Sequence, residues 1–351
     1  MTPLAKWTGP ALMGGIALIG AWSAFNTNWR LDTSFEDGVT QEALQDRFDD
    51  ALVIREGAID VWGHAFWSLF GQTSDGAVPG KDGWLFTNEE YRASPGFEAR
   101  LSASVAAIVD ARSALQAQGQ TLVIALIPDK ARIYDDHLAR PRAPAVTARY
   151  DALLDQLTAH GIEPLDLRPA LQEARMDADV FLRTDTHWTP FGAQTVAKAI
   201  VPQIAALGLE TTGFETEIAE EIPHTGDLMR YLPLIAPEAA GFGPQTLTRY
   251  TTVTAGGDLL GGADLLGGGG LFGDAPGLAS LIGTSFSANP NWHFDGWLKQ
   301  ETGVDLINRA DEGQGPFAPM RTYLADADAL SETTAGLVIW EIPERYTTLE
   351  Q

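Results

Sequence analysis

Two short segments of the chain carry residue types that could perform acyl transfer. Asp185 and His187 stand two residues apart in the segment TDTHW, shortly before Pro190. Ser285 lies much further along the chain, in the segment GTS that follows an apolar run. A serine hydroxyl becomes a good nucleophile when an imidazole removes its proton and a carboxylate fixes the tautomer of that imidazole. These residues therefore predict a Ser-His-Asp site, in the chain order Asp, His, Ser.

The local sequence favours the presentation of these three groups. Side chains two residues apart in an extended segment point to the same side, so Asp185 and His187 can be presented together. Gly283 permits a sharp turn after the preceding strand, and this turn would expose the hydroxyl of Ser285. The backbone N–H of Ser285 and one from a neighbouring loop could then hold an oxyanion.

Each of these signals also has other interpretations. The Asp-x-His pair could be a hydrogen bond at the start of a helix. Ser287 is a rival nucleophile deeper in the same turn. Asp185 and His187 could contribute to a metal site, but the sequence offers no second dense cluster of His, Asp or Glu to complete it, so we expect no metal and no other cofactor. We interpret the remaining histidines as structural or exposed, and these are His64, His137, His160, His224 and His293.

Strand and helix patterns alternate around these residues. Apolar runs predict strands at residues 84–86, 121–128, 164–167, 278–283, 304–308 and 336–342. Helical periodicity predicts helices at residues 100–117, 145–160, 294–302 and 316–330. A further helix is expected from Pro190, with Thr189 as its N-cap and an end or kink at Pro202. This alternation predicts an α/β fold with a mainly parallel sheet covered on both faces, and the glycine-rich residues 256–274 are expected to form a flexible loop.

Composition excludes several classes of function. The chain has 351 residues, of which 45% are hydrophobic, which is enough for a substantial core. It carries 23 basic and 47 acidic residues, for a formal charge of −24, and such a surface repels nucleic acid. The absence of cysteine excludes a disulfide framework, a thiolate nucleophile and a cysteine-ligated metal.

The N-terminal sequence predicts a membrane anchor. Residues 7–25 carry no charge, and a helix of this length can just cross a hydrocarbon layer of roughly 30 Å. Lys6 would stay in the cytoplasm, so the rest of the chain would be exported. A signal peptide cleaved near Ala21-Trp22-Ser23 is the alternative. We expect residues 1–30 to form the anchor and residues 31–74 a helical linker region.

Several segments, in the same order along the chain, resemble a known family. They are GKDGWLF at 80–86, PDKARIY at 128–134, DTHW at 185–188, GDL at 226–228, LFGD at 271–274, GTSFS at 283–287 and WEIPERY at 340–346. Over roughly residues 75–348 the sequence resembles the AlgX/AlgJ family of alginate O-acetyltransferase proteins. The resemblance implies a three-layer α/β/α SGNH-hydrolase-like domain over residues 75–351. In this domain type a circular permutation places the Asp-x-His segment before the Gly-x-Ser segment.

The resemblance also implies an activity and a location. It implies periplasmic transfer of acetyl groups to hydroxyls of an exopolysaccharide, either alginate or a similar polymer, with Asp185, His187 and Ser285 as the matched triad. A membrane-bound O-acyltransferase is the implied source of the acetyl group. Few residues follow Arg345, too few for a C-terminal carbohydrate-binding module, and this favours the anchored AlgJ-like members. The implied location is the periplasm, anchored to the inner membrane by the N-terminal helix, or free in the periplasm if a signal peptide is cleaved.

Further candidates follow other predicted strands or lie in glycine-rich turns. Ligands of parallel sheets bind near the carboxyl ends of the strands. On this ground the candidates for substrate or oxyanion binding are Lys130, Arg132, Tyr134, Gly313, Gly315 and Arg345. A structural salt bridge is an equally good interpretation of the charged residues. Trp340-Glu341-Ile342-Pro343 stands where an ordinary SGNH protein has Gly-x-Asn-Asp, so the side-chain oxyanion donor is unassigned.

Two other functions fit the same sequence. A secreted carbohydrate acetylesterase would use the same triad but would let water take the acetyl group. A non-catalytic scaffold within a polysaccharide-export complex would not need the hydroxyl of Ser285.

Overall fold

The computed structural model describes residues 73–349 except 94, 235–236 and 256–276, together with isolated positions nearer the N-terminus. The chain divides into two compact units, residues 1–73 with 233–236 and residues 74–232 with 237–351. The predicted anchor, nearly all of the predicted helical linker region at 31–74, and the glycine-rich residues 256–274 lie outside the described residues, apart from those isolated positions. Within the described part of the chain, no helix combines the length and the apolar character needed to span a membrane.

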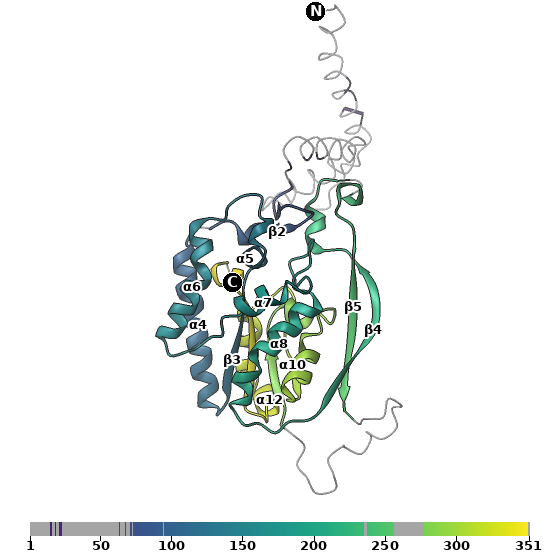
Figure 1. Ribbon diagram of the computed structural model, residues 1–351. Coiled ribbons are helices and arrows are strands. Elements are labelled where there is room, and N and C mark those ends of the chain that lie inside the picture. The colour runs from purple at the N-terminus through teal and green to yellow at the C-terminus, as the bar shows by residue number, and fades with distance from the viewer. Residues whose placement is uncertain are drawn as a thin grey trace, which may run out of the picture. The chain divides into compact units, whose positions relative to one another are not determined.

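A four-stranded parallel sheet forms the centre of the second unit (Figure 1). Its strands, in spatial order, are β3 (Thr121–Ile127), β8 (Leu337–Pro343), β6 (Ala279–Ile282) and β7 (Leu306–Asn308). Successive side chains of a strand point to opposite faces. Val123, Ala125 and Ile127 accordingly belong to one buried cluster, and Ile124 and Leu126 belong to the other. Both faces of the sheet are therefore buried, as the continuous apolar run predicted.

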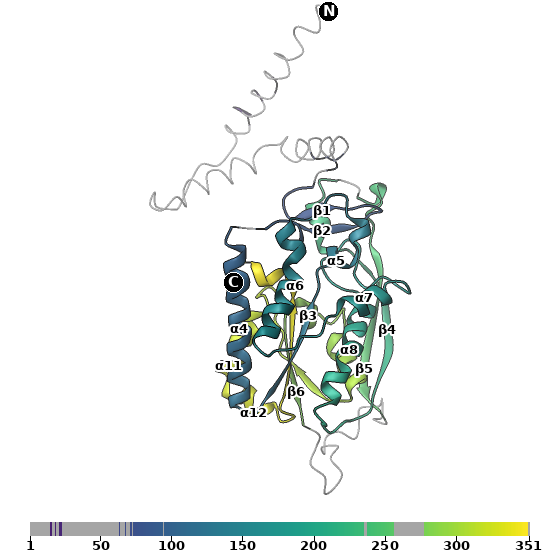
Figure 2. The same ribbon diagram turned by 60° about the vertical axis from the view of Figure 1, so that its left-hand side comes forward.

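Helices cover the two faces of the sheet (Figure 2). One face packs against α4 (Phe97–Ala117), α6 (Pro144–Ala159), α11 (Phe317–Ala325) and α12 (Ala327–Glu332). The other face packs against α7 (Arg168–Ala174), α8 (Pro190–Ala205) and α10 (Phe294–Thr302). The short helices α5 (Lys130–Ile133) and α9 (Ser285–Ala288) follow β3 and β6. The predicted α/β architecture is confirmed, with a layer of helices on each side of the parallel sheet.

In the part of the chain that the structure describes, two antiparallel pairs lie outside the central sheet. They are β1 (Ala77–Pro79) with β2 (Leu85–Thr87), and β4 (Phe214–His224) with β5 (Gln245–Thr254). The second pair was not predicted, because β4 is rich in glutamate, contains Pro223 and exposes most of its side chains. Such a strand shows little hydrophobic alternation, which is the main signal for a strand in a sequence. The 3-10 helices are η1 (Asn88–Glu90), η2 (Asp135–His137), η3 (Asp227–Tyr231), η4 (Pro237–Ala240) and η6 (Glu344–Thr348).

Three sequence predictions of elements were wrong in detail. Residues 164–167 form no strand and instead lead directly into α7. The helix predicted at 316–330 is divided at Asp326, whose side chain accepts hydrogen bonds from the N–H groups of Asp328 and Ala329 and so caps α12. The helix α8 continues past Pro202 to Ala205, so Pro202 does not end it at once. A proline removes the one backbone hydrogen bond of its own missing N–H, and here this loss falls in the last turn of the helix.

Candidate active site

The segment that carries Asp185 and His187 is a tight turn before α8. A β-bridge pairs Phe181 with Trp188, and the N–H of Leu182 donates to the carbonyl of His187 at 3.1 Å. Thr189 then caps α8, since its side chain accepts from the N–H of Gly192. These contacts fix both ends of the turn.

The ammonium group of Lys130 binds this turn from inside the protein. Its Nζ donates to the carbonyls of Leu182, Arg183 and Asp185 at 3.0, 3.3 and 2.7 Å. Burial lowers the pKa of Lys130 to about 8, although the negative charges of Glu90 and Asp185 oppose this shift. Lys130 therefore holds the backbone of the turn, and its ammonium group is saturated by carbonyls rather than offered to a ligand.

Ser285 lies at the turn between β6 and α9. Thr284 is the N-cap of α9, and Ser285 is its first residue. A Cβ on Gly283 would lie 2.5 Å from Oε2 of Glu341 and 2.8 Å from Oγ of Ser287, so this position requires glycine. The sequence predicted a glycine-dependent turn here, and the structure shows that close approach of Glu341 is the reason for it.

Ser285, His187 and Asp185 form one continuous chain of hydrogen bonds. Nε2 of His187 lies 2.7 Å from Oγ of Ser285, and Nδ1 of His187 lies 2.6 Å from Oδ1 of Asp185. The backbone N–H of His187 also donates to Oδ1 of Asp185 at 2.9 Å. Asp185 is 2% exposed and the side chain of His187 is 13% exposed, so the chain leads from the interior towards solvent. The structure thus brings together the three residues that the sequence singled out.

Asp185 also receives hydrogen bonds on its second oxygen. Nε2 of His224, at the end of β4, lies 2.8 Å from Oδ2 of Asp185, and the N–H of Asp227 donates to the same oxygen at 3.0 Å. Burial alone would raise the pKa of Asp185, but the hydrogen bonds from His187 and His224 hold it well below its ordinary value. The carboxyl group is therefore ionised at neutral pH, as a residue that orients an imidazole requires.

His224 is one of the residues at this site that sequence reasoning missed. It was interpreted as structural or exposed, because a lone histidine in a polar segment gives no chemical signal. The available clue was the segment GDL at 226–228, which follows His224 closely and carries the Asp227 N–H. Asp227 in turn accepts from the N–H and the hydroxyl of Thr186, at 2.8 and 2.6 Å.

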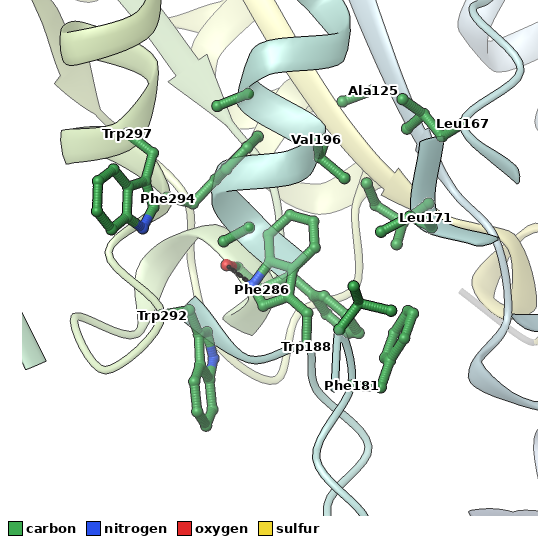
Figure 3. Close-up of a cluster of buried hydrophobic side chains, with 14 of the residues drawn as sticks. Ala125, Leu167, Leu171, Phe181, Trp188, Val196, Phe286, Trp292, Phe294 and Trp297 are labelled. Carbon is green, nitrogen blue, oxygen red and sulfur yellow. Dashed lines mark hydrogen bonds between the residues drawn. The ribbon is translucent and has the colours of Figure 1, made fainter. Parts of the chain in front are cut away.

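Aromatic rings lie beside the imidazole of His187, and three of the aromatic residues near it, Trp188, Phe286 and Trp292, are labelled in the buried cluster of Figure 3. The ring of Trp292 stacks on His187 with centroids 5.1 Å apart and an interplanar angle of 21°. Its Nε1 donates to the carbonyl of Ser285 at 3.1 Å. Phe286 lies on the imidazole at 4.8 Å, and its carbonyl accepts from Nε1 of Trp188. These rings tie the nucleophile turn to the Asp-x-His turn and surround His187 with apolar surface.

Ser287, the rival nucleophile, has a different environment. It is 2% exposed, and its hydroxyl donates to Oε2 of Glu341 at 3.0 Å. Ser285 is the serine that faces an imidazole. The geometry therefore favours Ser285 as the nucleophile.

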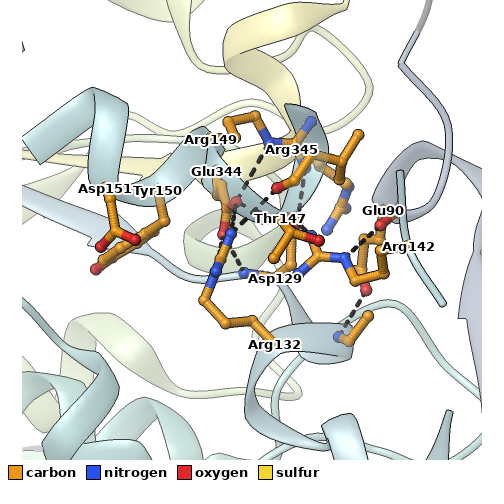
Figure 4. A network of polar contacts seen from close by, with 12 residues as sticks. Glu90, Asp129, Arg132, Arg142, Thr147, Arg149, Tyr150, Asp151, Glu344 and Arg345 are labelled. Atoms are coloured by element: carbon orange, nitrogen blue, oxygen red, sulfur yellow. Dashed lines mark hydrogen bonds and ion pairs between the residues drawn. The ribbon is translucent and has the colours of Figure 1, made fainter. Parts of the chain in front are cut away.

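Arg132 belongs to a buried network of ion pairs, which we call the ion-pair cluster (Figure 4). Its members are Asp129, Arg132, Arg142, Arg149 and Glu344. Asp129 pairs with Arg142 and with Arg149, the latter at 2.6 Å, and Glu344 pairs with Arg132 at 2.6 Å and Arg149 at 3.3 Å. The cluster follows the carboxyl ends of β3 and β8. Its contacts are structural, in line with the salt-bridge interpretation of Arg132.

Two further sequence candidates, Tyr134 and Arg345, contact residues other than Ser285. Tyr134 accepts a hydrogen bond from the N–H of Val180 at 2.9 Å, which is a structural contact. Arg345 is 4% exposed, and its guanidinium lies 5.2 Å from the ring of Phe286, with Nε 3.1 Å from a carboxylate oxygen of Glu89. Among the described contacts, none joins Arg345 to Ser285.

Gly313 and Gly315 lie in the loop after β7, and their role as oxyanion donors stays a prediction, since no described contact joins either of them to the triad. Both have positive φ angles, and a Cβ on Gly315 would face the ring of Tyr346 rather than the triad. The loop reaches the nucleophile turn at Asp311 instead, whose N–H donates to the carbonyl of Gly283 at 3.2 Å. Positive φ marks a turn as readily as it marks an oxyanion site, which is why the sequence signal was ambiguous.

A metal ion would have to compete with the hydrogen bonds of the site. Ligand atoms of Asp185, His187 and Asp227 lie within 4.8 Å of one another, which is a suitable spacing. However, Nδ1 of His187 bonds Asp185, and both carboxylate oxygens of Asp227 accept from Thr186. We therefore interpret these groups as a hydrogen-bond network.

The fold and this arrangement of groups are those of α/β proteins that use a serine for acyl transfer. A family model described as "SGNH hydrolase-like domain, acetyltransferase AlgX" matches residues 77–344. The probable alginate O-acetylases AlgJ of Pseudomonas syringae pv. tomato and Pseudomonas aeruginosa are 37% and 38% identical to the chain. These matches cover 95% and 96% of this chain and 86% and 88% of the relatives. The chain therefore belongs to the AlgX/AlgJ family, and the resemblance seen in the sequence is confirmed.

Solved structures agree with this assignment. The O-acetyltransferase domain of Pseudomonas putida AlgJ superposes with a TM-score of 0.69 at 34% identity, covering 79% of this chain and 94% of that domain. Pseudomonas aeruginosa AlgX gives a TM-score of 0.55 at 21% identity, covering 78% of this chain and 63% of that structure. The second likeness concerns the fold alone. Together with the parallel four-stranded sheet, these matches establish the α/β SGNH-like fold.

Proposed function

We propose that this protein is an O-acetyltransferase that carries an acetyl group on Ser285 and transfers it to hydroxyls of alginate or a similar exopolysaccharide. The observation that supports this most is the hydrogen-bonded chain from Ser285 through His187 to Asp185, with links of 2.7 and 2.6 Å. It occurs in a chain homologous over most of its length to proteins named as probable alginate O-acetylases.

The first half-reaction loads the serine. Nε2 of His187 takes the proton of Ser285 as Oγ attacks the carbonyl carbon of an acetyl donor. The N–H of Ser285 lies at the start of α9, where the N–H groups of a helix have no acceptor within the helix, so it is available to the oxyanion. The imidazolium, stabilised by Asp185, then gives its proton to the leaving group. The product is an acetyl ester of Ser285.

The second half-reaction transfers the acetyl group from Ser285 to the acceptor. A sugar hydroxyl gives its proton to Nε2 of His187 and attacks the acetyl carbonyl, and Ser285 recovers its proton as the ester bond to it breaks. Water would give hydrolysis by the same route. A transferase must keep water from the acetyl-serine, and the rings of Trp292 and Phe286 beside His187 reduce access to it.

The location and partners form part of the same proposal. Residues 1–30 would anchor the chain to the inner membrane, residues 31–74 would form a helical linker, and residues 75–351 would be a circularly permuted acetyltransferase domain in the periplasm. A membrane-bound O-acyltransferase would supply the acetyl group. N-terminal sequencing of the exported protein tests the anchor, because a mature chain that starts at about residue 24 would show cleavage instead.

The experiment that tests the function is the loss of polymer acetylation in cells. We expect Ser285→Ala and His187→Ala each to abolish acetylation, measured by NMR of the polymer, at unchanged protein level. Ser113→Ala, an exposed serine on α4, is the matched control and should leave acetylation unchanged. Normal acetylation with Ser285→Ala would contradict the proposal and favour a non-catalytic scaffold.

A second measurement separates the transferase from the alternative esterase. The purified protein is given an acetyl ester with and without an oligosaccharide acceptor. A transferase releases less free acetate when the acceptor is present and yields acetylated oligosaccharide, whereas an esterase releases the same acetate in both cases.

A further inference from the structure

Glu341 is a buried carboxyl residue beneath the nucleophile turn, and the mechanism above gives it no role. It lies on β8, is 0% exposed, and stands in the segment that replaces the Gly-x-Asn-Asp of ordinary SGNH proteins. Its Oε2 accepts from the N–H of Thr284 at 2.7 Å, from the hydroxyl of Thr284 at 3.0 Å and from the hydroxyl of Ser287 at 3.0 Å. Glu341 thus binds the turn on both sides of Ser285.

The hydrogen bonds of Thr284 extend this contact further. Its hydroxyl donates to Glu341 and accepts from the N–H of Phe286 at 3.3 Å, so the direction of the hydroxyl is fixed. Residues 284, 286 and 287 are all connected to one carboxyl group through this pattern. Oγ of Ser285 takes no part in it and remains available to His187.

Stability alone gives a poor reason for this carboxyl group. Burial of a carboxyl group in an apolar core is costly, and apolar residues of similar volume are often neutral or stabilising in its place. Burial indeed raises the pKa of Glu341 to about 7, although the hydrogen bonds from Thr284 and Ser287 oppose this shift. The neighbouring glycine, which leaves room for the carboxyl group, is a second local adaptation to it.

We propose that Glu341 is a positioning residue that holds the turn of Ser285 in the geometry needed for attack, with Oγ towards His187 and the N–H of Ser285 towards the oxyanion. This inference rests on the proposed function, because it assigns Ser285 as the nucleophile. Glu341 acts through Thr284 and Ser287 and contacts no substrate.

The test measures the reactivity of Ser285 itself, without polymer. The full chain is treated with a sulfonyl fluoride, which modifies activated serines, and with p-nitrophenyl acetate. Glu341→Met keeps the length of the side chain but removes all three hydrogen bonds. We expect the rate of Ser285 modification and kcat for the ester to fall about 100-fold, with KM changed less than about threefold. Glu341→Gln keeps one oxygen acceptor and should lose less than about fivefold.

A double-mutant cycle separates positioning from general destabilisation. Ser287→Ala removes one hydrogen bond of the turn and should slow labelling by about threefold, and this effect should vanish in the Glu341→Met background. The matched control is Ser280→Ala, a buried serine on β6 that bonds Thr333 at 2.7 Å and should leave labelling unchanged.

The outcomes distinguish this inference from the proposed function. If Ser285 of the wild type is not labelled, the nucleophile assignment fails and the inference fails with it. If the wild type is labelled and a folded Glu341→Met is labelled equally fast, only the role of Glu341 is overturned. If Glu341→Met does not fold, the labelling rates of Glu341→Gln and Ser287→Ala decide whether Glu341 positions the turn. Labelling of Ser285 at the wild-type rate in both variants would overturn the inference.

Discussion

The buried carboxyl groups near the carboxyl ends of the parallel strands have two kinds of surroundings. In the ion-pair cluster, Asp129 and Glu344 bind arginines. At the candidate active site, Asp185 binds two imidazoles and Glu341 binds hydroxyl and N–H groups. The first pair neutralises charge within the interior, whereas the second pair orients groups that lead to Ser285.

The pKa shifts of Asp129 and Glu341 have opposite directions, whereas the pKa of Asp185 is lowered like that of Asp129. Burial alone would raise the pKa of Asp129, but Arg149 and Arg142 lower it below its ordinary value. Burial raises the pKa of Glu341 to about 7, since hydrogen bonds only partly offset it. Charged residues at a sheet edge therefore do not by themselves mark a functional site. What marks it is a chain of donors and acceptors that ends on a reactive, partly accessible atom.

The ion-pair cluster should determine stability rather than chemistry. Asp129→Asn removes one of the two carboxylates that face the buried Arg142 and Arg149 and leaves only Glu344 near them, and we expect it to lower the free energy of unfolding by about 3–5 kcal/mol. Urea denaturation measures this. Sulfonyl fluoride labelling of Ser285 in the folded protein should stay within about twofold of the wild type.

The matched control for that variant is Asp151→Asn. Asp151 pairs with Arg168 at 2.7 Å, but its side chain is 61% exposed, so the loss should be below about 1 kcal/mol. Suppose that Asp129→Asn folds with normal stability but its Ser285 reacts slowly with the sulfonyl fluoride. The ion-pair cluster would then affect the chemistry of the candidate active site, and the proposed separation of the two regions would be wrong.

Sequence patterns predicted the central elements because those elements are apolar and continuous. The strands β3 and β8 and the helices α4 and α10 bury apolar side chains in the two clusters at the sheet. Their sequences therefore show continuous apolar runs in the strands and helical periodicity in the helices. The β4 and β5 strands were not predicted, since most residues of β4 are exposed, β5 is mostly polar and only partly buried, and their pairing connects segments distant in the chain. The short strand predicted at 164–167 was wrong because the alternating segment Pro-Leu-Asp-Leu is too short to distinguish a strand from a partly buried connection.

As with the fold, the local segments of the candidate site were predicted from the sequence, and the contacts between distant segments were not. Asp185, His187 and Ser285 stand in short local segments, so their types and spacing could be recognised. His224 and Glu341 reach the same site from other strands, through contacts that only the folded chain defines. Lys130 was singled out as a site residue, but its three carbonyl contacts, which give it a positioning role, depend on the path of a distant turn.

The raised pKa of Glu341 predicts a specific pH dependence. Its carboxyl group has a higher pKa in the folded protein, about 7, than its ordinary 4.5, so the protonated form stabilises the fold. That contribution is present below pH 4.5 and is lost as the pH rises through 7. Glutamine cannot ionise. Relative to the wild type, Glu341→Gln should therefore gain up to about 3 kcal/mol of unfolding free energy between pH 4.5 and pH 8, at about 1.4 kcal/mol per pKa unit.

Urea denaturation at several pH values between these limits checks that difference. Glu90 also has a pKa raised to about 7 by burial and by Asp129, but it is present in both proteins and cancels in the difference. Glu173→Gln, at an exposed position of α7, is the control, and its unfolding free energy should change with pH as that of the wild type does. If the unfolding free energy of Glu341→Gln changes with pH in the same way as that of the wild type, the carboxyl group of Glu341 has the same pKa in the folded and unfolded protein. Its contrast with Asp129 would then be lost.

His224 gives the smallest expected effect and the finest test of the contrast. It supplies one of the two donors to Oδ2 of Asp185, while Oδ1 keeps its bonds to His187. His224→Leu should therefore leave the chain to Ser285 intact but let the carboxylate rotate, and we expect kcat/KM for an acetyl ester to fall about 10-fold. His224→Gln, which can still donate, should recover most of the rate. His160→Leu, an exposed histidine, should have no effect. An unchanged rate with His224→Leu would mean that three hydrogen bonds orient Asp185 as well as four, and that the imidazole of His224 serves the β4 strand rather than the site.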